Sequence, residues 1–291
     1  MSGPGVDIDA ALVARMMADQ FREWSDLPLR AVASAGTDNT LFRLGDELLV
    51  RLPRVDWAAG MIAKEQRWLP TFSHRLPLAI SEPMGLGEPA EGYPWHWGVY
   101  AWLDGLDALA EPVTTSVEAA RALAGFVRAM QAVDTLGGPI AGRVNNYRGV
   151  ALSRLDARVR ECLARLEADI DTAAAARLWE DAVDAPQAPG VWIHGDLLPG
   201  NLLVRDGRLA GVIDFGLLGV GDPSVDLMAA WTVFGGQARE AFIETADADE
   251  ADWRRARGWA LYGAAVALPY YRDSNPVLAG ISRRTLGALL A

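Results

Sequence analysis

Cysteine, lysine and histidine are scarce in this chain of 291 residues, which has one cysteine, one lysine and three histidines. A single cysteine, Cys162, excludes an internal disulfide and is typical of a reducing cytoplasm. The histidines fall in three unconnected segments, which argues against a zinc cluster. Because Lys64 is the only lysine, any site that requires one has a single candidate.

Long apolar runs and basic clusters are also missing. The longest uncharged apolar stretch, 258–271, is too short to span a bilayer and contains a proline. The first residues do not combine a basic region with an apolar run, so no signal peptide is expected. A net charge of -11 disfavours nucleic acid as a partner. We therefore expect a cytoplasmic protein with neither a membrane nor a nucleic-acid partner.

The first third of the chain is rich in strand patterns. Apolar residues recur at helical spacing over 7–24, and a hairpin is predicted from two apolar runs, 39–44 and 47–52, around Gly45. A helix is predicted over 57–69, and the aromatic segment 96–103 predicts a strand. These elements are expected to form a β-rich N-terminal lobe, 1–103.

The rest of the chain, 104–291, is mostly helical in pattern and is expected to form a second lobe. Three short strands are predicted at 191–194, 201–204 and 208–213. Helices are predicted at 116–132, 150–168, 171–182, 223–234, 238–246, 252–268 and 277–290. The fold class is therefore α+β with two lobes, and a cleft between lobes is a usual place for a small-molecule site.

Three polar residues, Asp196, Asn201 and Asp214, lie at the ends of strand-like apolar segments. A hairpin between Asn201 and Asp214 folds the chain back, so the three side chains can meet at one end. Asn201 and Asp214 offer oxygen ligands that suit Mg²⁺ bound together with phosphates. Asp196 can orient a hydroxyl and accept its proton. The alternative interpretation is that these residues only cap turns and close the hairpin.

The spacing of these residues resembles the catalytic core of aminoglycoside phosphotransferase-type kinases. The matching residues are His194-Gly195-Asp196, then Asn201, then the segment 213–216, Ile-Asp-Phe-Gly. That family has the protein-kinase fold, but carries Gly where protein kinases usually carry Arg after the His. The resemblance implies ATP or GTP as phosphate donor, Mg²⁺, and a small-molecule hydroxyl as acceptor. It also implies roles for Asp196 in the catalytic loop and for Asp214 at the metal.

The next segment, 221–231, also resembles the family. Asp222 precedes Pro223 where a helix begins, so it is expected either to cap that helix or to serve the site. Asp226 is expected to brace the catalytic loop.

The resemblance also implies that the N-terminal lobe, 1–103, binds the nucleotide and that the C-terminal lobe, 104–291, carries out catalysis and binds the acceptor. The N-terminal lobe should therefore supply a loop that covers the phosphates and a cation that binds them. Residues Gly36, Thr37 and Asn39 lie in a turn before the first strand of the hairpin, where backbone N–H groups could contact phosphates. A kinase-like fold normally has a lysine on the following strand, and this chain has Arg51 there instead. Arginine binds phosphate through a planar fork, so the replacement does not exclude function.

A kinase-like fold also pairs the strand cation with a glutamate on the following helix. Glu65 is the candidate partner of Arg51. Lys64 lies about 100° away around that helix and is expected to be solvated. Arg54 follows Pro53 and is expected to face solvent.

The strand 96–103 would be the hinge, with the backbone from Tyr100 to Trp102 reading the purine. The tryptophans of this region, Trp95, Trp97 and Trp102, are equally compatible with packing alone.

The acceptor is less constrained. An acidic stretch, 239–253, could recognise a polycationic sugar or be a solvated face, and the aromatic C-terminal region could line a pocket for a less charged ligand. The sequence therefore favours an antibiotic kinase for an aminoglycoside or macrolide. A metabolic kinase for choline, homoserine or a sugar is one alternative. A catalytically silent, ligand-binding relative is the other, and the missing lysine is the feature in its favour.

Overall fold

The computed structural model describes residues 7–32, 38–135 and 137–291. The chain forms two compact units: Met1–Gly105 with Gly211–Gly216, and Leu106–Ala210 with Leu217–Ala291. The main chain therefore leaves the second unit after Ala210 and returns to it at Leu217. This excursion, which carries Asp214 into the first unit, was not expected from the sequence.

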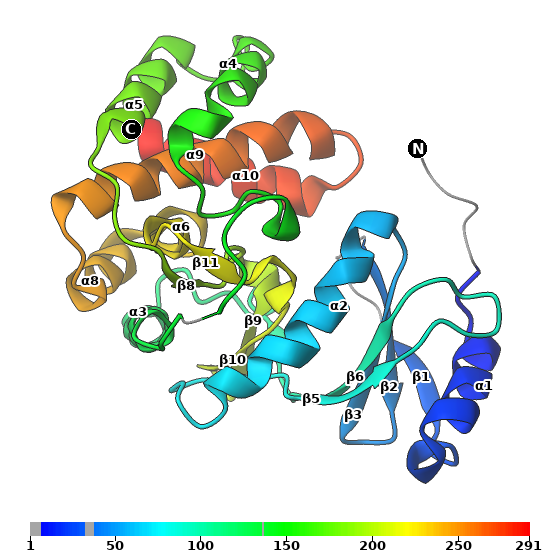
Figure 1. Cartoon of the computed structure of the whole chain (residues 1–291). Helices are drawn as coiled ribbons and strands as arrows, with labels where there is room; N and C mark the ends of the chain where they lie inside the picture. Colours follow the sequence, from blue (N-terminus) through cyan, green and yellow to red (C-terminus); the bar gives the residue numbers. More distant parts are fainter. Residues whose placement is uncertain (1–6, 33–37, 136) are drawn as a thin grey trace. The chain divides into compact units, whose positions relative to one another are not determined.

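The first unit contains a five-stranded antiparallel sheet in the order β1-β2-β3-β6-β5. The predicted hairpin is confirmed, with Gly45 at a positive φ of 60° in its turn. The strands are β1 Leu29–Val32, β2 Asn39–Leu44, β3 Leu48–Pro53, β5 Pro83–Gly87 and β6 Trp97–Ala101 (Figure 1).

Alternation of side chains along the strands separates two packing faces of this sheet. Val50 and Leu52 are buried in the same core as helix α1, Ala10–Gln20, whose first turn is capped by Asp9. Arg51 points to the other face, where helix α2, Asp56–Trp68, packs against β3, β5 and β6. The short elements of this unit are η1 Arg22–Trp24, η2 Leu69–Phe72 and β4 Ala79–Ile80. The strand period therefore directs Arg51 towards α2.

The second unit is mostly helical, and α9, Glu250–Tyr271, runs through its core. Helices α4, α5, α6 and α10 pack against α9 (Figure 1). The remaining helices are α3 Val117–Gln131, α4 Asp156–Ala164, α5 Thr172–Asp184, α6 Ser224–Leu227, α7 Ala229–Thr232, α8 Gly236–Ala246 and α10 Pro276–Leu290.

Two predicted helices of this unit differ from the structure. The segment predicted at 150–168 begins with a 3-10 turn, η4 Leu152–Leu155, and only then becomes α4. The segment predicted at 223–234 is two short helices, α6 and α7, with Met228 between them. There Trp231 N–H bonds to Met228 O at 2.9 Å, a tighter i to i−3 spacing than an α-helix uses.

Short strands position the functional loops. β8, Val191–Ile193, pairs with β11, Gly219–Gly221, and β7, Leu106–Asp107, pairs with β9, Leu202–Arg205. β9 and β10, Arg208–Val212, are joined by Asp206 and Gly207, both at positive φ as a type I′ turn requires. The remaining turns are η3 Arg143–Asn145, η5 Pro199–Asn201 and η6 Phe215–Leu217.

The end of β10 belongs to the first unit. Gly211 and Val212 pair in parallel with Ala79 and Ile80 of β4, and this pairing holds the start of the segment that contains Asp214.

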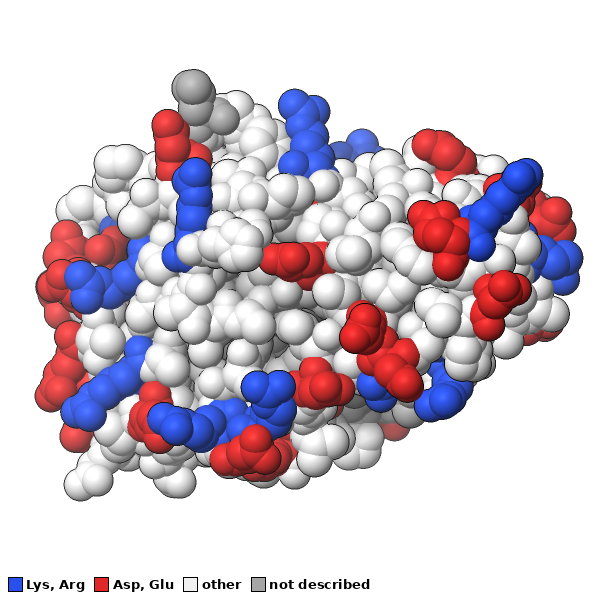
Figure 2. All heavy atoms as spheres, turned by 90° about the horizontal axis from the view of Figure 1, so that it is seen from below, with Lys and Arg blue, Asp and Glu red and all other residues white. Residues whose placement is uncertain are grey.

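The surface carries both signs of charge. On the face drawn in Figure 2, arginine and acidic side chains are interspersed. In the part of the chain that the structure describes, no helix combines the length and apolar character needed to cross a membrane.

Candidate active site

The predicted catalytic loop follows strand β8 in the second unit. Gly195 has a φ of 83°, and a Cβ at this position would lie 2.9 Å from the carbonyl oxygen of Leu217 and 3.1 Å from Cβ of Arg148. A side chain here would strain the backbone conformation and would clash with the carbonyl of Leu217. This explains why glycine stands between His194 and Asp196.

Asp226 braces this loop, as the sequence predicts. Its carboxylate accepts the N–H of His194 at 2.7 Å and the N–H of Gly195 at 2.8 Å. The side chain is 1% exposed. Burial raises the pKa of Asp226 to about 7, although both N–H groups oppose the shift. The conformation of the loop is thus tied to one buried carboxyl group.

The raised pKa predicts a pH dependence of stability. Between about pH 4, the usual pKa of an aspartate, and about pH 7 the folded protein holds a proton at Asp226 that the unfolded chain has released. The free energy of unfolding should therefore fall as the pH rises through this window, by up to roughly 4 kcal/mol from this group. Chemical denaturation at several pH values checks this, with Asp226→Asn as comparison. The Asn variant should lack this part of the slope, and an unchanged slope would contradict it.

Asp196 and Asn201 lie together in the same loop. The Asn201 side-chain amide donates to the Asp196 carbonyl oxygen at 2.8 Å and to its Oδ2 at 3.0 Å. The Asp196 N–H donates to Nδ1 of His194 at 3.2 Å. Because Nδ2 of Asn201 is engaged by Asp196, Oδ1 is the atom left to ligate a cation.

The first unit brings five predicted site residues together around Arg51, which is 9% exposed. Nη1 of Arg51 donates to the Glu65 carboxylate at 2.9 and 3.2 Å, so the predicted ion pair is confirmed. Nη2 donates to Oδ1 of Asp214 at 2.6 Å. With its amide oxygen turned towards Arg51, Asn39 accepts from Nη2 at 3.0 Å and from Nε at 3.2 Å. Tyr100 donates its hydroxyl proton to Glu65 at 2.7 Å.

The electrostatics of this cluster follow from burial and pairing. Burial by itself would lower the pKa of Arg51, but Asp214 and Glu65 outweigh it, so the guanidinium stays charged. Burial raises the pKa of Glu65, and Arg51 and the Tyr100 hydroxyl oppose that shift. Asp214 adopts a left-handed φ of 63°, which an aspartate tolerates better than most residues. The cluster holds one cation between two carboxylates.

Some backbone groups of the predicted hinge, in and just after β6, are already hydrogen-bonded within the first unit. Ala101 N–H donates to Glu82 O at 2.8 Å, and Trp102 N–H donates to Glu47 O at 2.7 Å. The side chain of Tyr100 is turned to Glu65. The carbonyl oxygen of Ala101 also accepts from Oγ of Ser81 at 2.8 Å, so purine contact through this segment stays a prediction. Gly36 and Thr37, the predicted phosphate cover, lie outside the described residues.

Two predictions about the neighbouring basic residues have different outcomes. Arg54 is exposed, as expected. Lys64 is half-buried, so the prediction of a solvated side chain is wrong, and burial lowers its pKa to about 8. The position is less exposed than the helix pattern suggests.

A buried ion pair that the sequence did not predict lies behind the catalytic loop. Arg255, on α9, is 1% exposed and donates through Nε to Asp222 at 3.1 and 3.2 Å. Arg255 also donates to Pro186 O and to Asp252. Asp222 accepts the N–H of Ser224 at 3.1 Å, so it forms a local turn at the helix start as well as the ion pair. Arg255 stands in the run Arg254-Arg255-Ala256-Arg257, where the sequence does not mark one arginine as buried.

Most of the acidic stretch 239–253 is engaged inside the chain. Asp249 caps α9 by accepting from Asp252 N–H at 2.8 Å, and Asp252 pairs with Arg255. Glu250 pairs with Arg257 at 2.9 Å, and Asp247 with Arg128 at 3.4 Å. Asp249 and Asp252 therefore have a structural role, while Asp247 and Glu250 form exposed ion pairs.

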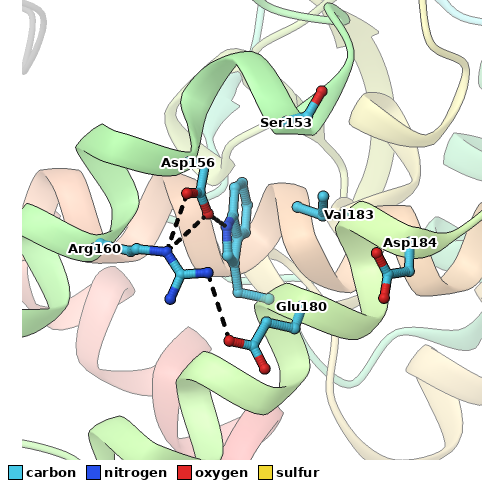
Figure 3. A pocket seen from close by; sticks show the side chains of 7 residues that line it. Ser153, Asp156, Arg160, Glu180, Val183 and Asp184 are labelled. Atoms are coloured by element: carbon cyan, nitrogen blue, oxygen red, sulfur yellow. Dashed lines mark hydrogen bonds and ion pairs between the residues drawn. The ribbon is translucent and has the colours of Figure 1, made fainter.

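A pocket of about 390 Å³ lies at α4 and α5, away from the predicted residues (Figure 3). Asp156 accepts from Arg160 at 3.0 and 3.1 Å and from Nε1 of Trp179 at 2.9 Å, and Arg160 reaches Glu180 at 3.5 Å. Asp156, Arg160 and Glu180 thus bond to one another, and Ser153 and Asp184 are drawn without a partner among the lining residues. None of the predicted site residues lines this pocket.

Comparison with known proteins identifies the family and the fold of the chain. A family model described as the phosphotransferase enzyme family matches residues 30–259. A search of curated proteins finds no match. The chain resembles the GDP and kanamycin complex of APH(2")-IIia, with a TM-score of 0.70 and 18% identity over 95% of this chain and 97% of that one. It also resembles macrolide 2'-phosphotransferase MphH from Brachybacterium faecium, with a TM-score of 0.62 and 20% identity over 96% and 97%.

Proposed function

The chain belongs to the phosphotransferase enzyme family, and from this premise we propose that it transfers the γ-phosphate of ATP or GTP to a hydroxyl of a small molecule. The observation that carries the proposal is the catalytic loop. Asp196 is fixed by Asn201, and the backbone before it is fixed by the buried Asp226. Solved structures with this fold include complexes named for GDP, ADP and ATP.

Asp196 acts on the attacking oxygen. Its carboxylate accepts a hydrogen bond from the acceptor hydroxyl and takes the proton as the new O–P bond forms. The bond from the γ-phosphorus to the β–γ bridging oxygen breaks, and the nucleoside diphosphate leaves with that electron pair. Positioning of the hydroxyl and electrostatic support are the main contributions that phosphoryl transfer needs from a protein.

Asn201 and Asp214 fit the metal that the family implies, because an amide and a carboxylate oxygen are hard ligands. Mg²⁺ bound there with the nucleotide would neutralise phosphate charge. Arg51 would contact the phosphates through its fork, held by Glu65. Backbone groups at Gly36, Thr37 and Asn39 would cover the phosphates, and the segment from Tyr100 to Trp102 would read the purine.

Mg²⁺ binding should depend on nucleotide. Two protein oxygens make a weak site, because Mg²⁺ gives up its water reluctantly. Calorimetry on the protein alone should show no tight Mg²⁺ binding, and addition of a non-hydrolysable nucleotide should produce it. Tight binding without nucleotide would show that further carboxylates contribute to the site.

Two acceptor classes fit the proposal. An antibiotic, either an aminoglycoside or a macrolide, is the first, because proteins of this fold are named for them. A metabolic alcohol such as choline, homoserine or a sugar is the second. We propose the cytoplasm as the compartment, where nucleoside triphosphates are available, with no nucleic-acid partner.

The proposal is tested by nucleotide consumption. Aminoglycosides, macrolides and metabolic alcohols are each incubated with ATP or GTP, and the phosphorylated product is identified by mass spectrometry. Acceptor-dependent consumption that is lost in Asp196→Asn supports phosphotransfer. Nucleotide binding without transfer to any acceptor would favour the catalytically silent alternative.

A further inference from the structure

An arginine with no acidic partner lies against the catalytic loop. Cβ of Arg148 is 3.1 Å from the point where a Cβ on Gly195 would be, so Arg148 touches the residue before Asp196. Both belong to the second unit. Among the described residues, no carboxylate lies within ion-pair distance of Arg148, and its buried Nε has no hydrogen-bond partner. This is unusual in a chain whose net charge is -11.

The backbone that carries Arg148 is fixed. Asn145 is fully buried; its Oδ1 accepts the N–H of Gly142 at 2.9 Å, and its Nδ2 donates to the carbonyl of Arg148 at 2.8 Å. Tyr147 N–H donates to Gly142 O at 2.7 Å. Asn146 and Tyr147 both adopt left-handed φ values, of 51° and 61°. The hydrogen bonds of the buried Asn145 amide therefore fix the backbone position of Arg148.

An aromatic ring positions the guanidinium. Cζ of Arg148 lies 5.6 Å from the centroid of Tyr262 on α9, within cation–π range. Tyr262 packs edge-on against Trp259, and Nε1 of Trp259 contacts Asp222 at 3.4 Å. A ring at this distance attracts the guanidinium without accepting an in-plane hydrogen bond from it, so the terminal N–H donors are available to an anion.

Three carboxylates in this part of the second unit are already engaged. Asp222 is paired with Arg255, and Asp226 accepts two backbone N–H groups. Asp196, the neighbour of Gly195, accepts from the amide of Asn201. Arg154 is a second arginine near an aromatic ring, 5.9 Å from that of Tyr147.

We infer that Arg148 binds an anionic group of the phosphoryl acceptor, so that the acceptor is an alcohol carrying a carboxylate, sulfate or phosphate. The inference rests on the proposed phosphotransferase function and decides between its two acceptor classes. On this inference the hydroxyl at Asp196 and the anion at Arg148 belong to one small molecule, and the supporting observation is that Cβ of Arg148 packs beside Gly195, the neighbour of Asp196. The anionic group of the acceptor is repelled by the carboxylate of Asp196, so such a molecule can bind in only one orientation.

The first test compares acceptors with and without a carboxylate: glycerate against glycerol and homoserine against its amide, with kanamycin as a polycation. The carboxylate member of each pair should have the higher kcat/KM. Arg148→Met should raise the KM of the carboxylate acceptor about 10- to 100-fold, as expected for a lost charged hydrogen bond, and leave its amide or alcohol analogue unaffected. Arg148→Lys should recover part of the loss. Arg177→Met, which removes an exposed arginine on α5, is the matched control and should have no effect.

Preferential use of kanamycin or of the neutral analogues, without dependence on Arg148, would overturn the inference and leave phosphotransfer intact. A rise in nucleotide KM in Arg148→Met, with acceptor KM unchanged, would also overturn it, because the anion would then be a phosphate of the donor.

A binding measurement is independent of turnover. The arginine side-chain N–H signals of the full chain are followed by ¹H–¹⁵N NMR during titration with sulfate and with glycerate. The Nε–H signal of Arg148 should shift in wild type and in Asp196→Asn, and the Arg177 signal should not. A shift at Arg148 without any phosphorylated product would support the anion site and contradict the proposed function. No shift at Arg148 with either anion would remove the site.

Discussion

Asp196→Asn is expected to lower turnover by about 10²–10⁴-fold, the usual contribution of a general base, while nucleotide affinity stays unchanged. The amide keeps the size of the side chain and can still contact Asn201, but it cannot take a proton from the acceptor. The loop should keep its conformation, because Asp226 holds the backbone of His194 and Gly195 and not the Asp196 side chain. Steady-state kinetics with the acceptor identified by the panel measures this.

Asp206→Asn is the matched control for Asp196→Asn. Asp206 is exposed in the β9–β10 turn at a φ of 54°, which asparagine adopts readily, so turnover should not change. If Asp196→Asn turned over as fast as wild type, Asp196 would have no part in proton transfer.

Replacement of Arg51 has the second large effect. Arg51→Ala removes the cation between Asp214 and Glu65, and Glu65 is 1% exposed. A buried carboxylate left without its cation typically costs about 3–5 kcal/mol. We therefore expect a clear loss in the free energy of unfolding, together with a raised nucleotide KM.

Arg51→Lys separates the two consequences. A lysine keeps the charge but not the fork that donates to Glu65 through one nitrogen and to Asp214 through another. The variant should remain folded and still lose catalysis, even though lysine is the usual residue of kinase-like folds at this place. Arg54→Ala, at an exposed position just after the same strand, is the control and should behave like wild type. Loss of nucleotide binding in Arg54→Ala with a normal Arg51→Ala would mean that Arg54 holds the phosphates.

Local patterns were sufficient for the fold class, and the resemblance to kinase-like folds supplied much of the site. It implied that Glu65 pairs with Arg51, and the structure confirms this ion pair. The physical reason is that alternation along β3 turns Arg51 to the face that α2 covers. The bracing of the catalytic loop by Asp226 was also predicted and is confirmed.

Contacts between distant segments were not readable from the sequence. Asp214 joins Arg51 because the end of β10 pairs with β4, a strand of only two residues that no pattern indicates. The burial of Arg255 depends on Asp222, 33 residues earlier in the chain. Arg148 lies in a stretch with no element pattern, and its position is set by the buried Asn145. In each case the partner, not the local sequence, decides the environment.

Transfer of labelled phosphate tests the central claim most directly. The γ-phosphate of ATP and of GTP is labelled, and the label is followed into each acceptor with wild type and with Asp196→Asn. The account predicts label on an acceptor hydroxyl with wild type and a loss of about 10²–10⁴-fold in rate with Asp196→Asn. Equal rates for the two proteins, or nucleotide that binds and never passes its label to any acceptor, would contradict it.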